Sequence, residues 1–376
     1  MYDHQGLQEI SYLMLYGGAA MLAIVACLYL LFSKGNMFNP QNKPVKELRM
    51  WTAAFFASVA LSHIWWVVLG INILADDRLV RNIIAVSLDR MTFIPLMMCV
   101  LVRMLQDKRR ALWPVAVSVV PMLIICVWGI VAHSEHCILY STYYCLGLCA
   151  MFVLLYVDKV RKYGKWLHDN YADLEHKEVW QGLVFLSIIL IVYIIYNSND
   201  GSLLIEYSTQ VNTLIIIVFL VWRVETLQPL ETEAPVVQQT EIEVPEDQGE
   251  QAEQVEESAN TNVYVKIGAL LKQKCESSQL YLEHDLSLQQ LAASIGTNRT
   301  YLSNYFAQQG TNYNTYINQL RIEHFIRLYR QALASSSNIT ASELAFQSGY
   351  HSYSTFGVAF KKHTGYSVKE WMDREK

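Results

Sequence analysis

The chain lacks the sequence patterns that most enzymes need. Its 376 residues contain no glycine-rich phosphate loop, no HExxH zinc motif and no GxSxG nucleophile elbow. No ATP-binding pattern of the kind found in histidine kinases follows its apolar segments. We therefore do not expect an enzyme, and the sequence assigns neither a catalytic residue nor a cofactor.

Cysteines in metal-binding or disulfide patterns are missing as well. The chain has seven cysteines, but none of their spacings resembles that of a zinc site. Most of them lie in apolar segments, where packing is the default role of a thiol. The sequence therefore predicts no metal site and no disulfide framework.

Positive charge is absent from residues 224–262. This stretch holds 11 acidic residues, no Lys or Arg and no aromatic residue. Such a composition buries too little apolar surface to offset the entropy cost of ordering, so we predict a disordered acidic linker. Two roles are open to it. The composition favours a solvated spacer, and the alternative is an acidic segment that competes with DNA phosphate for a basic surface.

Long apolar runs are abundant before this linker. A helix that crosses a bilayer needs about 20 apolar residues, within a usual range of roughly 17–25. Residues 1–223 contain several runs near that length, and we expect them to form a seven-helix membrane domain. The runs lie at residues 12–32, 51–74, 83–105, 113–132, 138–157, 180–196 and 203–222.

Lys and Arg are unevenly distributed among the connections between these runs. The first, third and fifth connections are basic, whereas the second balances its charges and the other two contain no base. The basic connections hold Lys34, Lys43, Lys46, Arg49, Arg103, Lys108, Arg109, Arg110, Lys159, Arg161, Lys162, Lys165 and Lys177. Basic loops stay on the cytoplasmic side. This predicts an outer N-terminus and a cytoplasmic C-terminal part.

Four ionisable side chains fall inside the predicted spans. They are His63, Asp89, Arg90 and Glu206. Such groups are costly in a bilayer and often mark functional sites, so they are the candidates for sensing a signal. The alternatives are structural: Glu206, one turn from the outer surface, snorkels toward water, His63 hydrogen-bonds a neighbouring helix, and the adjacent Asp89 and Arg90 need not pair with each other. Because the outer loops are short, we expect the signal to be a small apolar ligand or another membrane protein.

Residues 263–376 have a different character. They carry 12 basic and 8 acidic residues, a net charge of +4. Capping-box patterns at Ser287–Gln290, Thr340–Glu343 and Ser367–Glu370 mark three helix starts, because a hydroxyl and a carboxylate or amide satisfy the first free backbone donors. The pattern Leu-Ala-x-x-x-Gly at residues 291–296 recurs at residues 344–349. This part is therefore predicted to be a soluble helical domain with an internal repeat.

Each repeat predicts a helix-turn-helix unit. The small Ala allows two helices to approach, the Gly permits the turn, and apolar residues four apart bury one face of the second helix. Leu302 and Phe306 do this in the first unit, and Phe356 and Phe360 in the second. A longer helix at about residues 312–333 joins the units. The fold class is therefore all-α, a membrane bundle followed by a double helix-turn-helix domain.

This domain resembles the DNA-binding domain of the AraC/XylS family of bacterial transcription regulators. The resemblance covers about 100 residues and rests on the paired units, the joining stretch and the C-terminal run. The matching residues are Gly310, Tyr316, Ile317, Leu320, Arg321, Ile322, Gly349, Tyr350, His351, Ser352, Phe356, Phe360, Lys361, Lys362, Thr364 and Gly365. It implies two DNA readers that a rigid helix places in successive major grooves of double-stranded DNA.

The resemblance also assigns contact residues. In the first unit, base contacts are expected from Arg299, Thr300, Ser303 and Asn304, since Arg reads guanine and Asn reads adenine. In the second unit they are expected from Tyr353 and Ser354, with Lys361 and Lys362 on phosphate. A plain polar helix surface is the alternative for all eight. The role of Arg321 is open between DNA contact and a brace between the units.

Several positions depart from the family pattern. Val358 stands where the family often has Arg, and Asn304 and Ala307 stand where basic residues are common. Phe325 stands where the family usually has a small residue, and Val368 stands where it usually has Pro. These changes suggest less polar base readout, especially by the second unit, without loss of the fold.

The combined sequence predicts a membrane-anchored, sequence-specific transcription regulator that senses a membrane or envelope signal. A second interpretation is a seven-helix receptor or transporter-like protein whose helix-turn-helix domain binds a protein partner. The modest charge of the C-terminal domain leaves this alternative open. The two differ in salt dependence, because DNA binding weakens steeply as salt rises.

Overall fold

The computed structural model describes residues 7–38, 45–69, 77–174, 177–185, 187–189, 203–230, 263–335 and 339–375. Within these ranges the regular structure is helical, apart from one isolated β-bridge, so the predicted all-α class is confirmed. The chain divides into two compact units. Residues 1–163 and 179–232 form the first, and residues 164–178 and 233–376 form the second.

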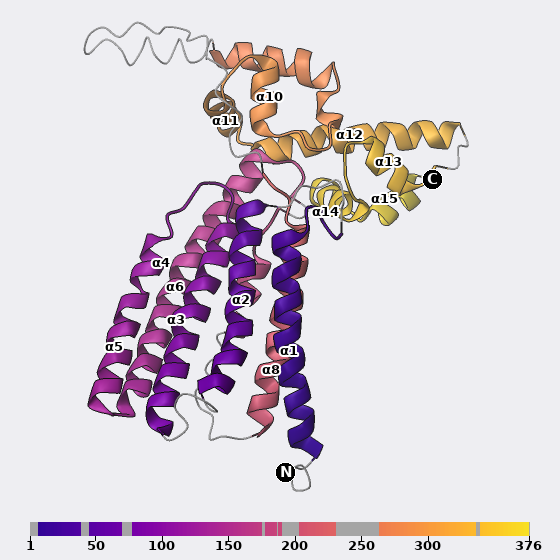
Figure 1. Cartoon of the computed structure of the whole chain (residues 1–376). Coiled ribbons are helices and arrows are strands. Elements are labelled where there is room, and N and C mark those ends of the chain that lie inside the picture. The colour runs from indigo at the N-terminus through magenta and orange to yellow at the C-terminus, as the bar shows by residue number, and fades with distance from the viewer. Residues whose placement is uncertain are drawn as a thin grey trace, which may run out of the picture. The chain divides into compact units, whose positions relative to one another are not determined.

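The first unit is a bundle of long helices (Figure 1). Its helices are α1 (Leu7–Phe32), α2 (Lys46–Val68), α3 (Arg78–Met104), α4 (Trp113–Val117), α5 (Val119–Ala132), the first part of α6 (His136–Asn170) and α8 (Leu203–Thr226). The predicted run 113–132 is divided at Ser118 into α4 and α5. Pro121 has no N–H to donate to the carbonyl of Val117, which weakens the helix at this point.

Six helical stretches of the described residues are long and apolar enough to cross a membrane. They are Ile10–Phe32, Lys46–Val68, Arg78–Met104, Trp113–Ala132, His136–Asn170 and Leu204–Thr226. These stretches match six of the seven predicted runs. The remaining run, residues 180–196, is described only in part, as helix at residues 181–185 and 187–189, so the count of seven stays a prediction.

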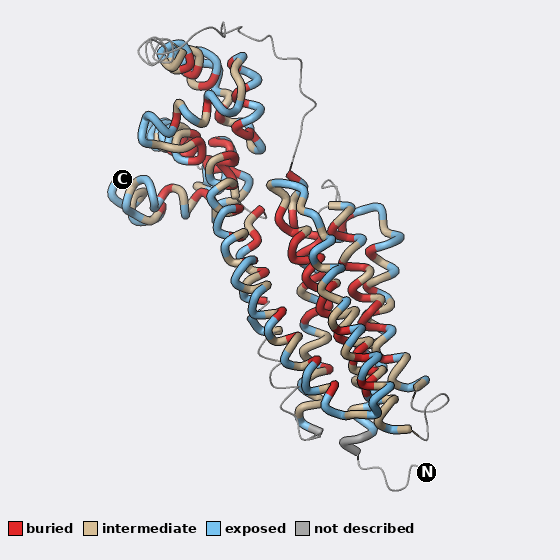
Figure 2. Tube along the Cα trace, turned by 90° about the vertical axis from the view of Figure 1, so that its left-hand side faces the viewer, coloured by how far each residue is buried: buried red, intermediate tan, exposed pale blue. Residues whose placement is uncertain are grey.

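Helices α2 and α3 lie at the centre of this bundle. About half of the apolar window of each is buried, 44% and 50%, against 17–22% for the other candidate spans. Exposed and half-buried residues cover much of the outer helices (Figure 2). Large apolar side chains are among them, such as Met14, Val131 and Leu154, each more than 70% exposed. The outer surface of the bundle is therefore apolar.

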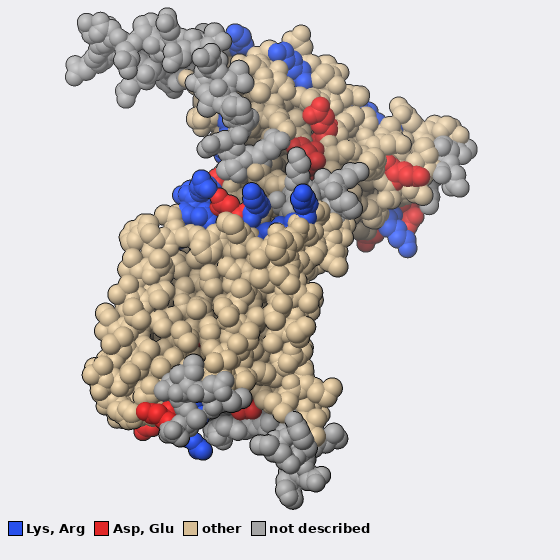
Figure 3. All heavy atoms as spheres, in the orientation of Figure 1, with Lys and Arg blue, Asp and Glu red and all other residues tan. Residues whose placement is uncertain are grey.

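On the face of the bundle that Figure 3 shows, surface charge lies at the two ends. Lys and Arg gather at one end, while the flank between the two ends shows no charged side chain in this view (Figure 3). Ion pairs form at the basic end, where Arg103 and Arg109 contact Glu47, and Arg110 contacts Asp107. This is the end that the loop charges predict to be cytoplasmic.

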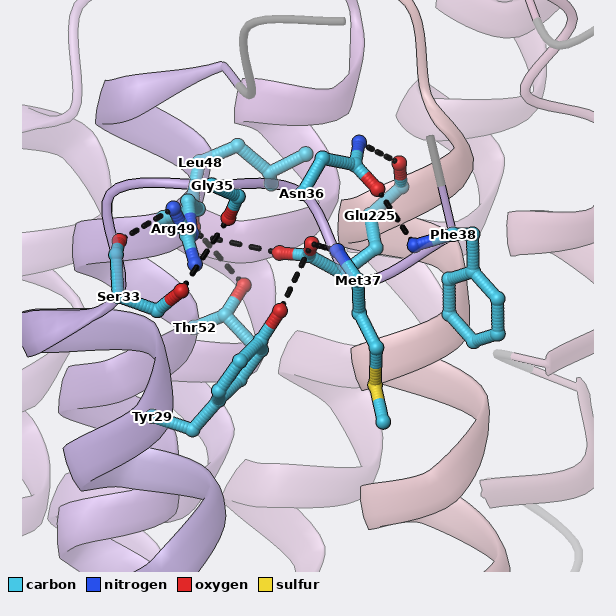
Figure 4. A network of polar contacts seen from close by, with 10 residues as sticks. All are labelled: Tyr29, Ser33, Gly35, Asn36, Met37, Phe38, Leu48, Arg49, Thr52 and Glu225. Carbon is cyan, nitrogen blue, oxygen red and sulfur yellow. Dashed lines mark hydrogen bonds and ion pairs between the residues drawn. The ribbon is translucent and has the colours of Figure 1, made fainter. Parts of the chain in front are cut away.

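A buried ion pair holds the last turn of α8 at this end. The Glu225 carboxylate lies 3.3 Å from Nε of Arg49 on α2, and their side chains are 0% and 7% exposed. Glu225 also accepts hydrogen bonds from the Tyr29 hydroxyl at 3.0 Å and the Met37 backbone N–H at 2.8 Å. Arg49 Nη1 donates to the carbonyl of Ser33. The network joins α1, the first connection, α2 and α8 (Figure 4).

The second unit contains the predicted repeats. A helix at residues 263–271 continues as a π-helical turn η2 (Lys272–Glu276) and a short 3-10 turn η3 (Leu280–Leu282). The remaining helices are α10 (Leu288–Ile295), α11 (Arg299–Gln308), α12 (Tyr313–Ala334), α13 (Ala341–Gln347), α14 (Tyr353–Thr364) and α15 (Val368–Glu375). Both capping boxes expected at Ser287 and Thr340 are formed, and Ser367 and Glu370 exchange the same two hydrogen bonds.

Each helix-turn-helix unit has its own apolar core. The first contains Leu291, Leu302, Phe306 and Ile317 of α12, together with residues that precede α10, namely Ile267, Leu271, Cys275, Tyr281 and Leu286. The second is aromatic and surrounds Phe325 of α12, which packs against Phe356, Phe360 and Tyr329. The joining helix α12 therefore contributes to both cores, as a rigid connection between two readers requires.

The domain boundaries differ from the predicted ones at two places. Helix α8 continues to Thr226 and buries Val224 and Glu225, which the prediction assigned to the linker. Residues 164–178, predicted as part of the membrane domain, group with the C-terminal unit. The rest of the predicted linker, residues 231–262, lies outside the described residues.

Candidate nucleic-acid interface

Helix α11 presents the first candidate reading surface. Asn298 caps its start by accepting a hydrogen bond from the N–H of Tyr301 at 2.9 Å, which satisfies a free donor of the first turn. Leu302 and Phe306 are buried and fix the rotation of the helix. The predicted readers Arg299, Thr300 and Asn304 are exposed on the other side, with Ser303 half-buried. The four are thus exposed or half-buried, and DNA contact stays a prediction for each.

Helix α14 presents the second surface in the same way. The Ser352 hydroxyl caps it by accepting from the N–H of Thr355, and Phe356 and Phe360 are buried. The predicted residues are all exposed, with Tyr353 and Ser354 in the first turn and Lys361 and Lys362 in the last. Val358, 73% exposed, lies between these two groups. Val358 thus places an exposed apolar side chain on this surface, where the family often has Arg.

The turns in the two units are made by glycines with a left-handed backbone. Gly296 ends α10 at φ +78°, and Gly349 follows α13 at φ +88°. A Cβ on Gly349 would meet Nε of Arg321 and the carbonyl of Leu282, both at 2.9 Å. Only glycine therefore satisfies both the conformation and the space at position 349.

Arg321 connects the two helix-turn-helix units of the C-terminal domain. It lies on α12 with 0% of its surface exposed, and its Nε donates to the carbonyl of Tyr281 at 2.7 Å. Its Nη2 donates to the carbonyl of Glu283 at 2.6 Å, and its guanidinium lies over the ring of Tyr350. Arg321 thus ties the segment before the first unit to the turn of the second, and it is not available to DNA.

A second link joins the loops that precede α10 and α14. Nε2 of His351 lies 3.0 Å from the carboxylate of Asp285. This hydrogen bond raises the pKa of His351 and lowers the pKa of Asp285. The charge of Asp173 also raises the pKa of His351, and the charge of Lys177 lowers it. Burial lowers the pKa of the neighbouring His284.

The His351 pair predicts a pH-dependent contribution to stability. A raised His pKa stabilises the fold below its unfolded value of about 6.5, and this is lost as pH rises through the folded pKa. A lowered Asp pKa stabilises above about 3.9 and is lost at lower pH. We expect His351→Gln to destabilise the second helix-turn-helix unit by less than about 1 kcal/mol, since the pair of His351 and Asp285 is partly exposed.

Native-state hydrogen exchange in α13 and α14 of the full chain measures this effect. The difference between wild type and His351→Gln should be largest near pH 5.5 and should shrink toward pH 8. Asp285→Asn should give the same trend, because it removes the same pair. A difference that stays constant or grows with pH would contradict the assignment.

The candidate sensing residues lie in the helix bundle, and three of them form hydrogen bonds with neighbouring helices. Asp89 on α3 accepts hydrogen bonds from Ser62 Oγ at 2.6 Å and from the indole N–H groups of Trp65 and Trp66 at 3.1 and 2.8 Å. Arg90 points elsewhere and donates to groups of α6, namely the Ile138 carbonyl and the hydroxyls of Ser141 and Thr142. The adjacent charges therefore do not pair with each other, as the helical rotation of about 100° per residue predicts.

The other two candidates lie along α2 and α8. The His63 ring is buried, with Nδ1 2.7 Å from the Val59 carbonyl, Nε2 3.0 Å from Gln210 of α8 and the Tyr16 ring 4.3 Å away. Glu206 lies half-buried in the first turn of α8. The structure brings Asp89, Trp65 and Trp66 together, and separately His63 and Gln210, but no single cluster unites the four predicted residues. A sensing role stays a prediction for each.

Sequence reasoning missed several polar partners. Trp65 and Trp66 were not singled out as sensing candidates, yet both donate to Asp89. Gln210 and Glu225 were not singled out, although both are buried and bonded to other helices. Polar residues in apolar runs were the available signal. Among the described residues, no group of three or more His, Cys, Asp or Glu is placed to hold a metal ion.

Comparison with known proteins gives one consistent result. A family model described as "Helix-turn-helix domain" matches residues 291–374. An uncharacterized HTH-type transcriptional regulator of Staphylococcus aureus strain MRSA252 is 28% identical over 102 residues, 27% of this chain and 13% of that protein. Regulators with the same description from strains COL and MW2 match with the same identity and coverage. The chain thus spans a small part, 13%, of the length of these relatives. No solved structure matches the chain.

Proposed function

We propose that this chain, whose residues 291–374 form an AraC-type helix-turn-helix domain, is a membrane-anchored transcription regulator. The observation that carries the proposal is the presence, in one chain, of two exposed recognition helices joined by α12 and of six helices apolar enough to span a bilayer. In this proposal the anchor is the bacterial inner membrane and the C-terminal unit faces the cytoplasm.

The outer surface of the first unit supports the anchoring. Its flank is apolar between two charged ends, and large hydrophobic side chains on it are exposed. An apolar surface of this extent is unfavourable in water and favourable against lipid. The signal in this proposal is a small apolar ligand or another membrane protein, which acts on the bundle that holds Asp89 and His63.

The recognition helices support DNA as the partner. Arg299 and Asn304 offer bidentate hydrogen bonding to guanine and adenine, and Lys361 and Lys362 offer two phosphate contacts. Val358 offers an apolar contact of the kind that suits a thymine methyl group. The chain would bind DNA either while anchored or after proteolysis in the predicted linker.

Salt dependence tests DNA binding against the alternative of a protein partner. The full chain in lipid nanodiscs would be titrated with duplex DNA. Each neutralised phosphate contributes a slope of about −0.9, so two contacts alone predict roughly a tenfold loss of affinity between about 50 and 200 mM salt. Lys361→Gln should reduce the slope by about 1 for all sequences. Absence of salt-dependent duplex binding would favour the protein-partner alternative.

The Arg299→Ala variant tests the assignment of base contacts. We expect a loss of about 1–3 kcal/mol at one base position, together with relaxed preference at that position. Binding to a library of duplexes with every base varied measures this directly. An equal loss on all sequences would make Arg299 a phosphate contact instead.

A further inference from the structure

Residues 164–178 belong to the DNA-binding unit although they lie far from it in sequence. Residues 164–170 are the last turns of α6, which is also a candidate membrane span. Two separate parts of the sequence therefore contribute described residues to the second unit. The contacts that residues 164–178 make within this unit suggest what they do.

The backbone of Tyr171 and Ala172 is bound by two buried side chains of α12. Nδ2 of Asn314 donates to the carbonyls of Tyr171 and Ala172 at 2.9 and 2.8 Å. Nδ2 of Asn318 donates to the same carbonyl of Ala172 at 3.0 Å. Tyr171 also forms the isolated β-bridge with Ser287, at the start of α10. Side-chain amides that bind backbone carbonyls recognise the position of a segment more than its sequence.

The segment also completes the first core. Ala172 is 3% exposed and belongs to the same apolar cluster as Leu288, Leu291 and Ile317. Beyond it, the Lys177 ammonium is 6% exposed and lies 3.9 Å from the carboxylate of Asp285. Tyr171, Ala172 and Lys177 are thus packed or bonded to the unit at several points, so this is a built docking surface for one segment of the same chain.

The last turns of α6 reach a predicted base reader. The guanidinium carbon of Arg299 lies over the ring of Trp166 at 5.8 Å from its centroid. Arg299 is the first residue of α11, and Trp166 precedes the docked carbonyl of Tyr171 by little more than one helical turn. A guanidinium that rests on an indole ring gains a cation–π interaction, which must be given up when the same group binds guanine.

We propose that residues 164–178 regulate DNA binding by the domain, because they hold Trp166 over Arg299 and withhold this guanidinium from DNA. The docked segment is covalently continuous with α6, so a rotation or shift of α6 would move Trp166 and release Arg299. The proposal rests on the proposed function as a DNA-binding regulator. It assigns the coupling to this segment and not to the acidic residues 231–262.

Docking can be tested without DNA. Hydrogen exchange would be followed in the full chain in lipid nanodiscs. Asn314→Ala/Asn318→Ala removes the donors to Tyr171 and Ala172, and we expect exchange of residues 171–174 to rise about tenfold or more. Gln319→Ala, at an exposed position of the same helix, is the matched control and should change nothing. Protection of α14 reports that the second core remains folded. Wild-type residues 171–174 that exchange freely, or a double variant like the control, would overturn the docking.

Regulation is tested by a double-mutant cycle on DNA affinity. Trp166→Ala should tighten binding of the full chain by about two- to fivefold, the range expected for one exposed cation–π interaction. In an Arg299→Ala background the same change should have no effect, because the restraint acts through Arg299. A segment that only completes the core predicts equal or weaker binding by Trp166→Ala, and that result would overturn the proposal. Absence of duplex binding by the wild type would instead contradict the proposed function and leave the exchange result standing.

Discussion

Replacing Arg321 by Leu is expected to destabilise the C-terminal compact unit, which contains both helix-turn-helix units, by roughly 2–4 kcal/mol. Two hydrogen bonds from a charged group are worth about 1.5–3 kcal/mol each, and the relief of a buried charge offsets part of their loss. The variant leaves the buried carbonyl of Tyr281 and the part-buried carbonyl of Glu283 without their donor. Because Arg321 joins the two readers, their spacing on DNA should also become less defined.

Native-state hydrogen exchange of the full chain measures this effect locally, since a chain with two units need not unfold in one step. Protection should fall in η3 and α12–α14. Arg330→Leu, on the exposed side of the same helix where Arg330 pairs with Glu375, is the matched control and should have a much smaller effect. Equal effects of the two variants would contradict the bracing role of Arg321.

Replacing Glu225 by Gln should destabilise the helix bundle by about 3–5 kcal/mol. Loss of one partner leaves the other charge buried without compensation, and this dominates the cost of breaking a buried ion pair. Here the remaining charge is Arg49, whose side chain is 7% exposed. The double replacement Arg49→Met/Glu225→Met should recover a large part of the loss, because neither charge is then buried.

Thermal unfolding in detergent, followed by thiol labelling, reports on this unit. Cys99, Cys126 and Cys145 are buried, so they should react only after the bundle opens. Their labelling should begin at a lower temperature in Glu225→Gln. Glu47→Gln removes a half-exposed pair at the same end of the bundle and should shift it little. A shift no larger than that control would show that the Arg49 pair does not stabilise the bundle.

The helical elements of the second unit could be predicted from sequence because their signals are local. A hydroxyl three residues before Gln or Glu, and a Gly after a short apolar helix, specify the ends of α10 and α13 within a few residues. Apolar residues four apart then fix which faces of α11 and α14 are buried. For this reason the eight predicted DNA contacts lie on outward or half-exposed positions, with only Ser303 half-buried.

Long-range polar contacts could not be predicted in this way. Nothing near Asn314 in the sequence indicates that it binds the carbonyl of Tyr171, 143 positions earlier. The pair of Arg49 and Glu225 is hidden for the same reason, and Glu225 moreover follows a run that already looks long enough to span a bilayer. The role of Arg321 was open in sequence because Arg serves DNA and carbonyl oxygens equally well, and only its burial separates the two.

The most direct test of the central claim is to map DNA bound to the full-length chain in intact cells. The chain would be crosslinked in place, recovered from the membrane fraction and its bound DNA sequenced. The account predicts discrete enriched sites with a shared sequence, and a change in preference at one base in Arg299→Ala. Recovery of no enriched site above an untagged control would contradict it.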